Sequence, residues 1–368
     1  MPNVQGRPLH TRSLTVIISR QSDTRWHARG DVIDLRKHSF VPLVNDIQPA
    51  GVIHMMSIDF DFDPEALRIE GIKIEQPYVA IEPSEATGGD CCRDPAPLLL
   101  ELNGDLLGPD FSKRLSRHFG GAAGCSHLLT LFQLMASTIP QVVDFENGRV
   151  RRDGEAQPFG KRFFRRSLFV DGHERNDQIV DVALQLTDTH TRPIGAEEPS
   201  TARLESSHEI KATASLDRKH FKIESLEARE RRRRFDTLAE APWISHDALM
   251  SKLEGVPVIP GMARRVFDLL GDEPALRPLR DALLQLAPGF IQIAAALMDE
   301  YFAKQGAKQS NNQARSETGP SPETRDVNPS EKPAVAAIGG NVNSCYMWRE
   351  DGHVAKTWGA VRVRPKAN

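Results

Sequence analysis

Cysteine is scarce in this chain of 368 residues, which contains only four, two of them adjacent at Cys91 and Cys92. So few thiols make a poor disulfide framework, and their usage is typical of a reducing compartment. Residues 1–13 contain no apolar signal core, and no apolar run approaches the roughly 20 residues needed to cross a bilayer. We therefore expect free thiols, a cytoplasmic location and no membrane partner.

Excess charge of either sign is also missing. The chain has 47 Lys and Arg against 50 Asp and Glu, which gives a formal net charge of -3. A protein whose main work is to neutralise nucleic-acid phosphate normally carries a clear positive excess. The basic run at 228–234 has no interleaved aromatic residues, and on a strand its charges would divide between two faces. We expect a small-molecule substrate and no nucleic-acid partner, and a homodimer is left open.

The familiar short catalytic motifs are absent too. The sequence contains no Walker A loop and no GxGxxG, HExxH or GxSxG pattern. Their absence excludes the commonest nucleotide-binding, dinucleotide-binding, zincin and α/β-hydrolase interpretations. Any function must therefore be argued from smaller groups of residues.

What the sequence does contain is an internal duplication. Four strand-like stretches followed by three helical stretches occur twice, and one offset of 154 residues aligns the copies. The aligned pairs are Arg12 with Arg166, Leu14 with Leu168, Asp34 with Asp188, His54 with His208, Asp63 with Asp217 and Ile69 with Ile223. Self-similarity at a fixed spacing indicates a repeated structural unit. It predicts an α+β fold of two pseudo-repeated antiparallel sheet units, paired about a pseudo-twofold axis, each with helices on one face.

The same pattern predicts where the units begin and end. We expect a first repeat over 1–145, a charged linker over 146–160, a second repeat over 161–303, a disordered segment over 304–337 and a C-terminal β-hairpin over 338–368. The disordered segment has almost nothing apolar to bury. The hairpin is predicted because Asp351-Gly352, a strong two-residue turn signal, lies between apolar stretches.

The stretch GAAGCSHLL at 121–129 is the leading candidate for chemistry. Ser126 is predicted to cap a helix, with His127 in its first turn. There the helix dipole favours a neutral His127 and makes Cys125 more acidic than a free thiol. A neutral imidazole can accept a proton, as a general base must. The alternative is tight helix packing with an inert cysteine, but the second copy begins its helix with Pro278–Asp281, so the helix does not require Cys or His.

Other residues complete the predicted site. His54 is the candidate partner acid or second base, or else an ordinary sheet-edge residue. Arg12 would orient an anionic or phenolic group, unless it is a surface ion-pair partner. Trp26 and Cys125 would shape the pocket. Asp59 is kept as a substrate-binding candidate, although alternation places it on the opposite strand face, where a solvated acidic surface is the simpler interpretation.

A metal centre is the alternative use of these residue types. Zinc accepts Cys and His ligands, but the spacing here matches none of the familiar finger or ribbon patterns. Neighbouring side chains on an extended chain point opposite ways, so only one of Cys91 and Cys92 is expected to face a site. The candidate zinc ligands are His54, Cys92, Cys125, His127 and Cys345.

Several of these residues carry a resemblance to a known family. Gly124 to Leu128, preceded by His54 and by LNGDLLGP at 102–109, resembles the bacterial domain of unknown function DUF2889. Its members carry a Gly-Cys-Thr-His-Leu helix start, an upstream arginine strand and a late cysteine before an Asp-Gly turn. The matching positions here are Arg12, Cys92, Cys345 and Asp351-Gly352, whereas Tyr346 stands where the family has histidine.

The resemblance implies a small-molecule catabolic enzyme, because members are common in bacteria that degrade aromatic and other environmental carbon compounds. We therefore predict a cofactor-independent lyase or isomerase acting on an aromatic, lignin-derived compound, with His127 as general base and His54 as its partner. One alternative is a metal-dependent hydrolase or lyase. Another is a non-catalytic module that binds a ligand or a protein, in which the cysteines are merely packed.

Overall fold

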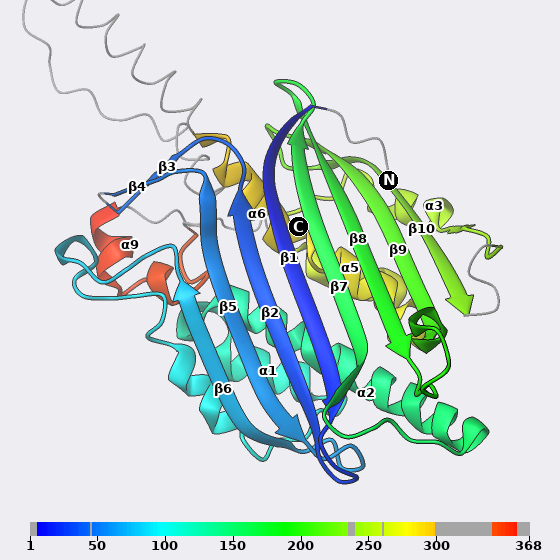
Figure 1. Cartoon of the computed structure of the whole chain (residues 1–368). Helices are drawn as coiled ribbons and strands as arrows, with labels where there is room; N and C mark the ends of the chain where they lie inside the picture. The colour runs from blue at the N-terminus through cyan, green and yellow to red at the C-terminus, as the bar shows by residue number, and fades with distance from the viewer. Residues whose placement is uncertain (1–5, 45, 235–239, 260, 299–340, 359–368) are drawn as a thin grey trace, which may run out of the picture.

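The computed structural model describes residues 6–44, 46–234, 240–259, 261–298 and 341–358, and in that part of the chain nine strands form one continuous antiparallel sheet (Figure 1). The strand order is β11-β10-β9-β8-β7-β1-β2-β5-β6, so the first repeat supplies one half and the second repeat the other. The strands are β1 Arg7–Arg20, β2 Trp26–Arg36, β5 Gly51–Phe62, β6 Ile69–Tyr78, β7 Lys161–Glu174, β8 Ile179–Thr191, β9 Leu204–Asp217, β10 Ile223–Arg234 and β11 Ile244–Ser245.

The two repeats join at the centre of the sheet, where β1 pairs antiparallel with β7. Leu14 lies opposite Leu168, its own equivalent at the offset of 154. One residue to either side, Ser13 faces Phe169 and Thr15 faces Ser167. A twofold axis through the Leu14 pair produces this register, because it exchanges equivalent residues of the two strands. The predicted α+β fold with a duplicated antiparallel unit is therefore confirmed.

Helices cover one face of the sheet (Figure 1). Helix α2 packs over β1, β2 and β5, α6 packs over β1 and β7, and α5 packs over β8 and β9. The main core lies between these layers, because alternate strand residues such as Leu14, Val16 and Ile18 point toward the helices. The helices are α1 Phe111–Phe119, α2 Ser126–Asp153, α3 Asp247–Met250, α4 Met262–Leu270, α5 Arg277–Leu283, α6 Leu286–Ala295 and α9 His353–Trp358.

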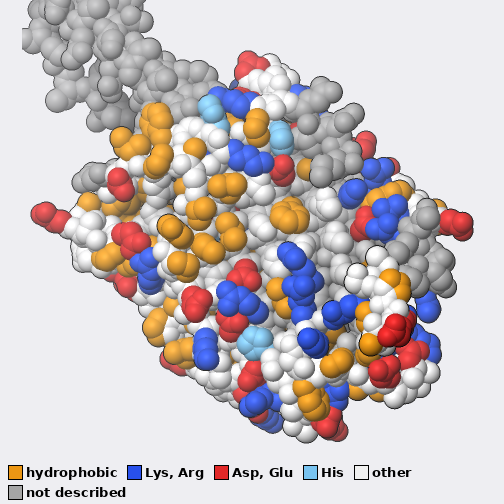
Figure 2. All heavy atoms as spheres, viewed as in Figure 1, with side chains coloured by type: hydrophobic (Ala, Val, Ile, Leu, Met, Phe, Trp, Pro, Cys, Tyr) orange, Lys and Arg blue, Asp and Glu red, His pale blue; other side chains and the backbone are white. Residues whose placement is uncertain are grey.

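The uncovered face of the sheet is mostly charged. Figure 2 shows Lys, Arg, Asp and Glu side chains across it, with hydrophobic side chains gathered toward one end. Exposed apolar residues near the ends of β2, β5 and β6 include Leu35, Val52, Met55 and Tyr78. The basic run of β10 adds ion pairs here, since Arg231 donates to Glu209 of the neighbouring strand.

Helix α2 is the longest element on the helical face. Its 28 residues end at Asp153, where Gly154 takes a left-handed conformation with φ 72°. The helix therefore runs through the first part of the segment expected as a linker, 146–160. It is long and apolar enough to cross a membrane, but 56% of its most apolar window is buried inside the protein. That burial is typical of a core helix.

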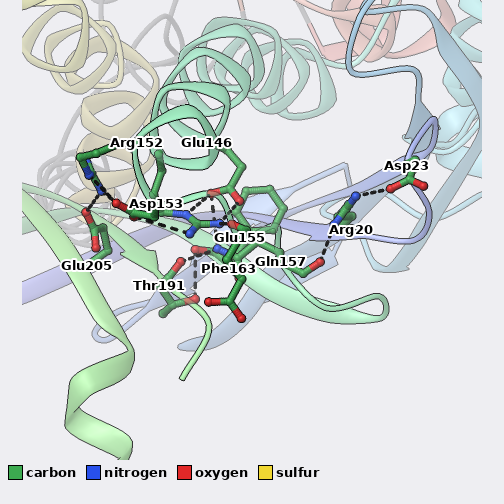
Figure 3. Close-up of polar contacts among 11 residues, drawn as sticks. Arg20, Asp23, Glu146, Arg152, Asp153, Glu155, Gln157, Phe163, Thr191 and Glu205 are labelled. Atoms are coloured by element: carbon green, nitrogen blue, oxygen red, sulfur yellow. Dashed lines mark hydrogen bonds and ion pairs between the residues drawn. The ribbon is translucent and has the colours of Figure 1, made fainter. Parts of the chain in front are cut away.

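Polar contacts fix the connector between the repeats to the end of α2. Figure 3 shows Gln157, which donates to the Glu146 carboxylate and to the backbone oxygen of Thr191 in β8. Glu146 also accepts from Arg149, and both side chains are buried. A buried polar group needs such partners, so the connector has a defined path.

The predicted C-terminal β-hairpin is wrong over the described residues 341–358. This segment forms a 3₁₀ turn at Tyr346–Trp348 followed by α9. Asp351-Gly352 ends the turn, with the Gly352 N–H donating to the Arg349 carbonyl, instead of joining two strands. The physical reason is burial: Met347, Trp348 and Val354 form a small second core with Val44 and Ile81. The predicted disordered segment 304–337 lies outside the described residues.

Two smaller differences concern the site. A short hairpin of β3 Val41–Leu43 and β4 Asp46–Gln48 interrupts the connection from β2 to β5, where no strand was expected. The last helical stretch of the second repeat is divided into two helices, α5 and α6, around Leu284 and Gln285. Both features bring residues to one cavity beside the end of β2 and the start of β5.

Candidate functional site

Three strands of the first repeat place a polar row on the buried face of the sheet. Arg12 lies opposite Asp34 in the β1–β2 pair, and Asp34 lies opposite His54 in the β2–β5 pair. Each residue continues the phase of the buried apolar positions on its strand, so all three point toward the helices. Arg12 Nη1 donates to Asp34 Oδ2 at 3.0 Å, and His54 Nδ1 lies 3.4 Å from the same oxygen.

The first turn of α2 adds His127 to this row. Its Nε2 lies 3.3 Å from Asp34 Oδ2, and its ring stacks on that of His54 with centroids 3.8 Å apart. On the other side, His10 Nε2 lies 3.1 Å from Asp34 Oδ1. One fully buried carboxylate is thus surrounded by a guanidinium and three imidazoles, and the His127 side chain is 13% exposed.

The electrostatics of the row follow from burial and from Arg12. Burial alone would raise the pKa of Asp34, but Arg12, the hydrogen bond from His10 and the nearby imidazole of His54 hold that pKa well below its usual range. Burial, aided by His54, lowers the pKa of His127 well below 6.5. Burial, more than the helix dipole, thus favours the neutral His127 that the sequence predicts. Because a carboxylate can only accept hydrogen bonds, contact with Asp34 favours a proton on Nε2 and leaves Nδ1 of His127 as an acceptor.

Cys125 lies beside that acceptor nitrogen. The helix begins at Ser126, so Cys125 and not Ser126 occupies the N-cap position, without a side-chain cap bond. Cys125 Sγ lies 3.9 Å from His127 Nδ1. The expectation of an acidic Cys125 is wrong, because burial raises the pKa of its thiol and outweighs the hydrogen bonds from the helix N-terminus. The sulfur stays protonated, which makes the imidazole the basic group of the pair.

A cavity of about 150 Å³ opens next to His127. The sequence-predicted metal set all faces this one cavity, namely His54, Cys92, Cys125, His127 and Cys345. Burial raises the pKa of Cys345 to about 11 and that of Cys92 well above its usual value. The other walls are mostly apolar and come from the β3–β4 hairpin, α6 and the C-terminal segment. Cys91 does not line the cavity, as expected for one of two adjacent cysteines.

The residues that could hold a metal differ from the predicted set. Ligand atoms of Asp34, His54 and His127 lie within 4.8 Å of one another, and no cysteine belongs to this group. His54 Nδ1 has no hydrogen-bond partner among the described residues, which leaves it free to bind an ion. Two imidazoles and one carboxylate suit zinc or iron(II). Against a metal stands Arg12, whose permanent charge already contacts the same carboxylate oxygen.

Two predicted site residues lie elsewhere. Trp26 is at the opposite end of β2, packed edge-on against Phe62 and Phe163 in the core. Asp59 lies on the uncovered face of the sheet, where it pairs with Arg29 at 3.0 Å. Neither residue lines the cavity beside His127.

Sequence reasoning missed three residues of the site, namely Asp34, His10 and Gln292. The first two had a signal, because they share the period-two phase of buried neighbours on β1 and β2. Gln292 had none. It comes from α6 of the second repeat, and its side-chain amide lies 3.3 Å from His127 Nε2. The second repeat therefore supplies part of the site.

The second repeat also contains its own version of the row. Arg166 lies opposite Asp188, and Asp188 lies opposite His208. Arg166 binds Asp188 through two hydrogen bonds of 2.7 and 2.8 Å. The position equivalent to His127 is 127 + 154 = 281, and Asp281 accepts from Arg166 Nη1 at 2.6 Å. The ion pair between Arg166 and Asp281 therefore occupies the place that His127 has in the first repeat. The fold itself does not require an imidazole at this position.

Comparisons with known proteins agree with the duplication. No curated protein and no solved structure was found to match the chain. The family DUF2889, described as a protein of unknown function, matches residues 10–141 and 164–292. The two segments start 164 − 10 = 154 residues apart, which is the offset that aligns the repeats. The chain belongs to the DUF2889 family and carries the family's unit twice.

Proposed function

We propose that this protein is a bacterial, cytoplasmic enzyme of small-molecule catabolism, a cofactor-independent lyase or isomerase that acts on an aromatic compound by general acid-base catalysis. One observation carries the proposal. The first repeat closes its polar row with the neutral imidazole of His127 beside a cavity, whereas the second repeat closes the same row with Asp281. The cytoplasmic location is supported by the four unpaired cysteines.

The proposed roles follow from the contacts. Nδ1 of His127 accepts a proton from the substrate, while Asp34 orients the ring and stabilises the imidazolium. In a lyase reaction, the proton leaves a side-chain hydroxyl, the adjacent C–C bond breaks to release a carbonyl fragment, and its electron pair enters the aromatic part. His54, whose ring centroid lies 3.8 Å from that of His127, donates a proton to that part and is reprotonated by the proton that His127 accepted. The electron pair of the broken bond stays in the aromatic product and the number of protons is unchanged, so no oxidant or reductant is needed.

The size and lining of the cavity support an aromatic substrate. An apolar cavity of about 150 Å³ is known to accommodate benzene, and the cavity beside His127 has about that volume. Its apolar walls would exclude water from the reacting atoms. The three thiols, with pKa values of Cys92, Cys125 and Cys345 all raised, add no charge to it.

The proposal is tested with phenols that carry a hydroxylated side chain of two or three carbons. Products of side-chain cleavage or isomerisation are measured by chromatography and mass spectrometry. We expect His127→Gln to lower the rate by at least about 100-fold, the usual scale of general-base catalysis. His208→Gln, at the equivalent of His54 in the second repeat, is the matched control and should keep the rate. Full activity of the His127→Gln protein would exclude the role of the imidazole.

A second candidate function is a metal-dependent hydrolase or lyase, favoured by the convergence of Asp34, His54 and His127. Elemental analysis of protein purified without chelators distinguishes the two candidates. Less than about half an equivalent of zinc or iron would count against an obligatory metal. A full equivalent that is lost in the His54→Gln protein and kept in the His208→Gln protein would favour this second candidate over the first.

A further inference from the structure

His127 lies between two cavities. Besides the cavity of about 150 Å³ described above, a second one of about 260 Å³ lies on its other side. The residues common to both linings are Ser126, His127, Ile291 and Gln292. The first turn of α2 and one turn of α6 therefore form a thin partition, and the proposed base is part of it.

The second cavity combines apolar walls with one unusual polar group. Its apolar lining comes from the second repeat and consists of Val258, Ile259, Met262, Ala263, Ala287, Pro288 and Ile291. Arg12 lines it from the first repeat and is 1% exposed. Its Nη1 binds Asp34 and its Nη2 binds Thr130, but its Nε has no hydrogen-bond partner among the described residues. A buried donor without a partner is costly, so an acceptor oxygen on a ligand would be favoured there.

We infer that the substrate is an elongated molecule with two ring-sized parts, one ring in each cavity and the reacting carbon beside His127. The inference rests on the proposed function of His127 and adds the class of substrate. The first cavity has room for a single ring, and the second has room for another ring with an oxygen substituent directed to Arg12. Gln292 must turn aside to let such a molecule through, because its side chain belongs to the partition.

Binding measurements test this without requiring turnover. The probes are 4-ethylphenol, with one ring, and 4,4′-dihydroxybibenzyl, which has two phenol rings joined by two carbons. Burial of a second ring should make the two-ring probe bind about 10- to 100-fold more tightly in calorimetry. Equal affinities of the two probes would overturn the inference.

Variants that fill one cavity at a time locate each ring. Ala263 is exposed at the edge of the second cavity, so Ala263→Phe should weaken the two-ring probe about tenfold and leave 4-ethylphenol unchanged. Ala80→Phe fills the first cavity and should weaken both probes. Ala248→Phe, on exposed α3, is the control for an added ring and should change neither. If Ala263→Phe does not fold, Ala287→Leu fills the same cavity.

The outcomes separate this inference from the proposed function. If Ala263→Phe weakened both probes equally or neither of them, the second cavity would not hold part of the ligand. If both probes bind as expected but no two-ring compound is converted, the shape of the ligand stands and the catalytic role of His127 fails. If a compound is converted but the two probes bind with equal affinity, the catalytic role of His127 stands and the two-ring shape of the ligand fails.

Discussion

At the scale of single residues, Asp34 links stability to the proposed chemistry, because one carboxylate both neutralises the buried Arg12 and contacts the imidazole of His127. Removing one charge of a buried pair leaves the other uncompensated, which costs about 3–5 kcal/mol. We expect Asp34→Asn to lower the free energy of unfolding by about that amount, measured by urea denaturation.

The matched control for this prediction lies three residues away on the other face of the same strand. Asp31 pairs with Arg29 at 2.9 Å, but both side chains are substantially exposed. Exposed pairs contribute about 0–1 kcal/mol, so Asp31→Asn should change stability little. Equal effects of the two substitutions would mean that Asp34 does not act as one member of a buried pair.

His190 predicts how stability depends on pH. Burial lowers its pKa to about 4 in the folded protein, although nearby Asp188 opposes the shift. The unfolded chain, with a histidine pKa of about 6.5, therefore binds the proton first as pH falls. Stability from this group is present above about pH 6.5 and is lost as the pH falls toward 4. His190→Gln should flatten that decline, measured as unfolding free energy at several pH values; curves parallel to those of the unchanged protein would contradict this.

The site residues that the sequence predicts are recognisable from local sequence, whereas the missed ones depend on strand phase or on packing between the repeats. His54 and His127 were predicted because their residue types are chemically distinctive and their local patterns are short. Asp34 stood in the repeat alignment as a shared position, but its burial depends on the phase of β2, in which it follows the buried Val32. Gln292 becomes a neighbour of His127 only when α6 packs across the repeat boundary, and no local pattern encodes that contact.

At the scale of elements, the position of α6 depends on a glycine in β7. A Cβ added at Gly172 would lie 2.3 Å from Ile293 Cγ1, in the turn that carries Gln292. Because Ile293 is β-branched and fully buried, it cannot rotate away easily. We expect Gly172→Ala to lower stability by about 1–3 kcal/mol through overpacking and to weaken ligand binding, since α6 must move.

Gly30 in β2 offers the comparison. A Cβ there would lie 2.5 Å from Met135 Sδ of α2. Methionine is unbranched and flexible, so it can yield where isoleucine cannot. Gly30→Ala should therefore lower the melting temperature less than Gly172→Ala does. The opposite order would show that α2, and not α6, is the more tightly fixed helix.

The elements that the sequence predicted are those with a regular pattern and a buried face. The long strands and the start of α2 followed from period-two alternation and from the glycine-rich turn before Ser126. The β3–β4 hairpin was missed because its strands have only three residues each. The C-terminal hairpin was wrong because a turn signal at Asp351-Gly352 says nothing about whether the flanking residues find a strand partner or a small core.

At the scale of the whole molecule, duplication allows one repeat to keep a structural row while the other gains chemistry. Both rows share an Arg, an Asp and a His on neighbouring strands. In the second repeat Asp281 adds an ion pair to Arg166, and in the first repeat His127 meets a cavity that the second repeat helps to enclose. Residues of both repeats thus line the cavity beside His127, with His54 as its second imidazole.

The C-terminal segment should complete this cavity without holding the main fold together. Residues 344–348 form one wall, but Met347, Trp348 and Val354 belong to a small core separate from the one under the sheet. A chain ending at residue 340 should keep most of its melting temperature, lose the ring-sized phenol probe, and expose Cys92 and Cys125 to a thiol reagent. Arg349→Ala, which removes the ion pair to Asp90 at 2.8 Å and the contacts of the guanidinium with Tyr346 but keeps the segment, should raise the labelling rate by less. If Cys92 and Cys125 were labelled at the same rate in the shortened chain, other residues would have to close the cavity. The phenol probe would then be bound by residues of the sheet and α6 alone.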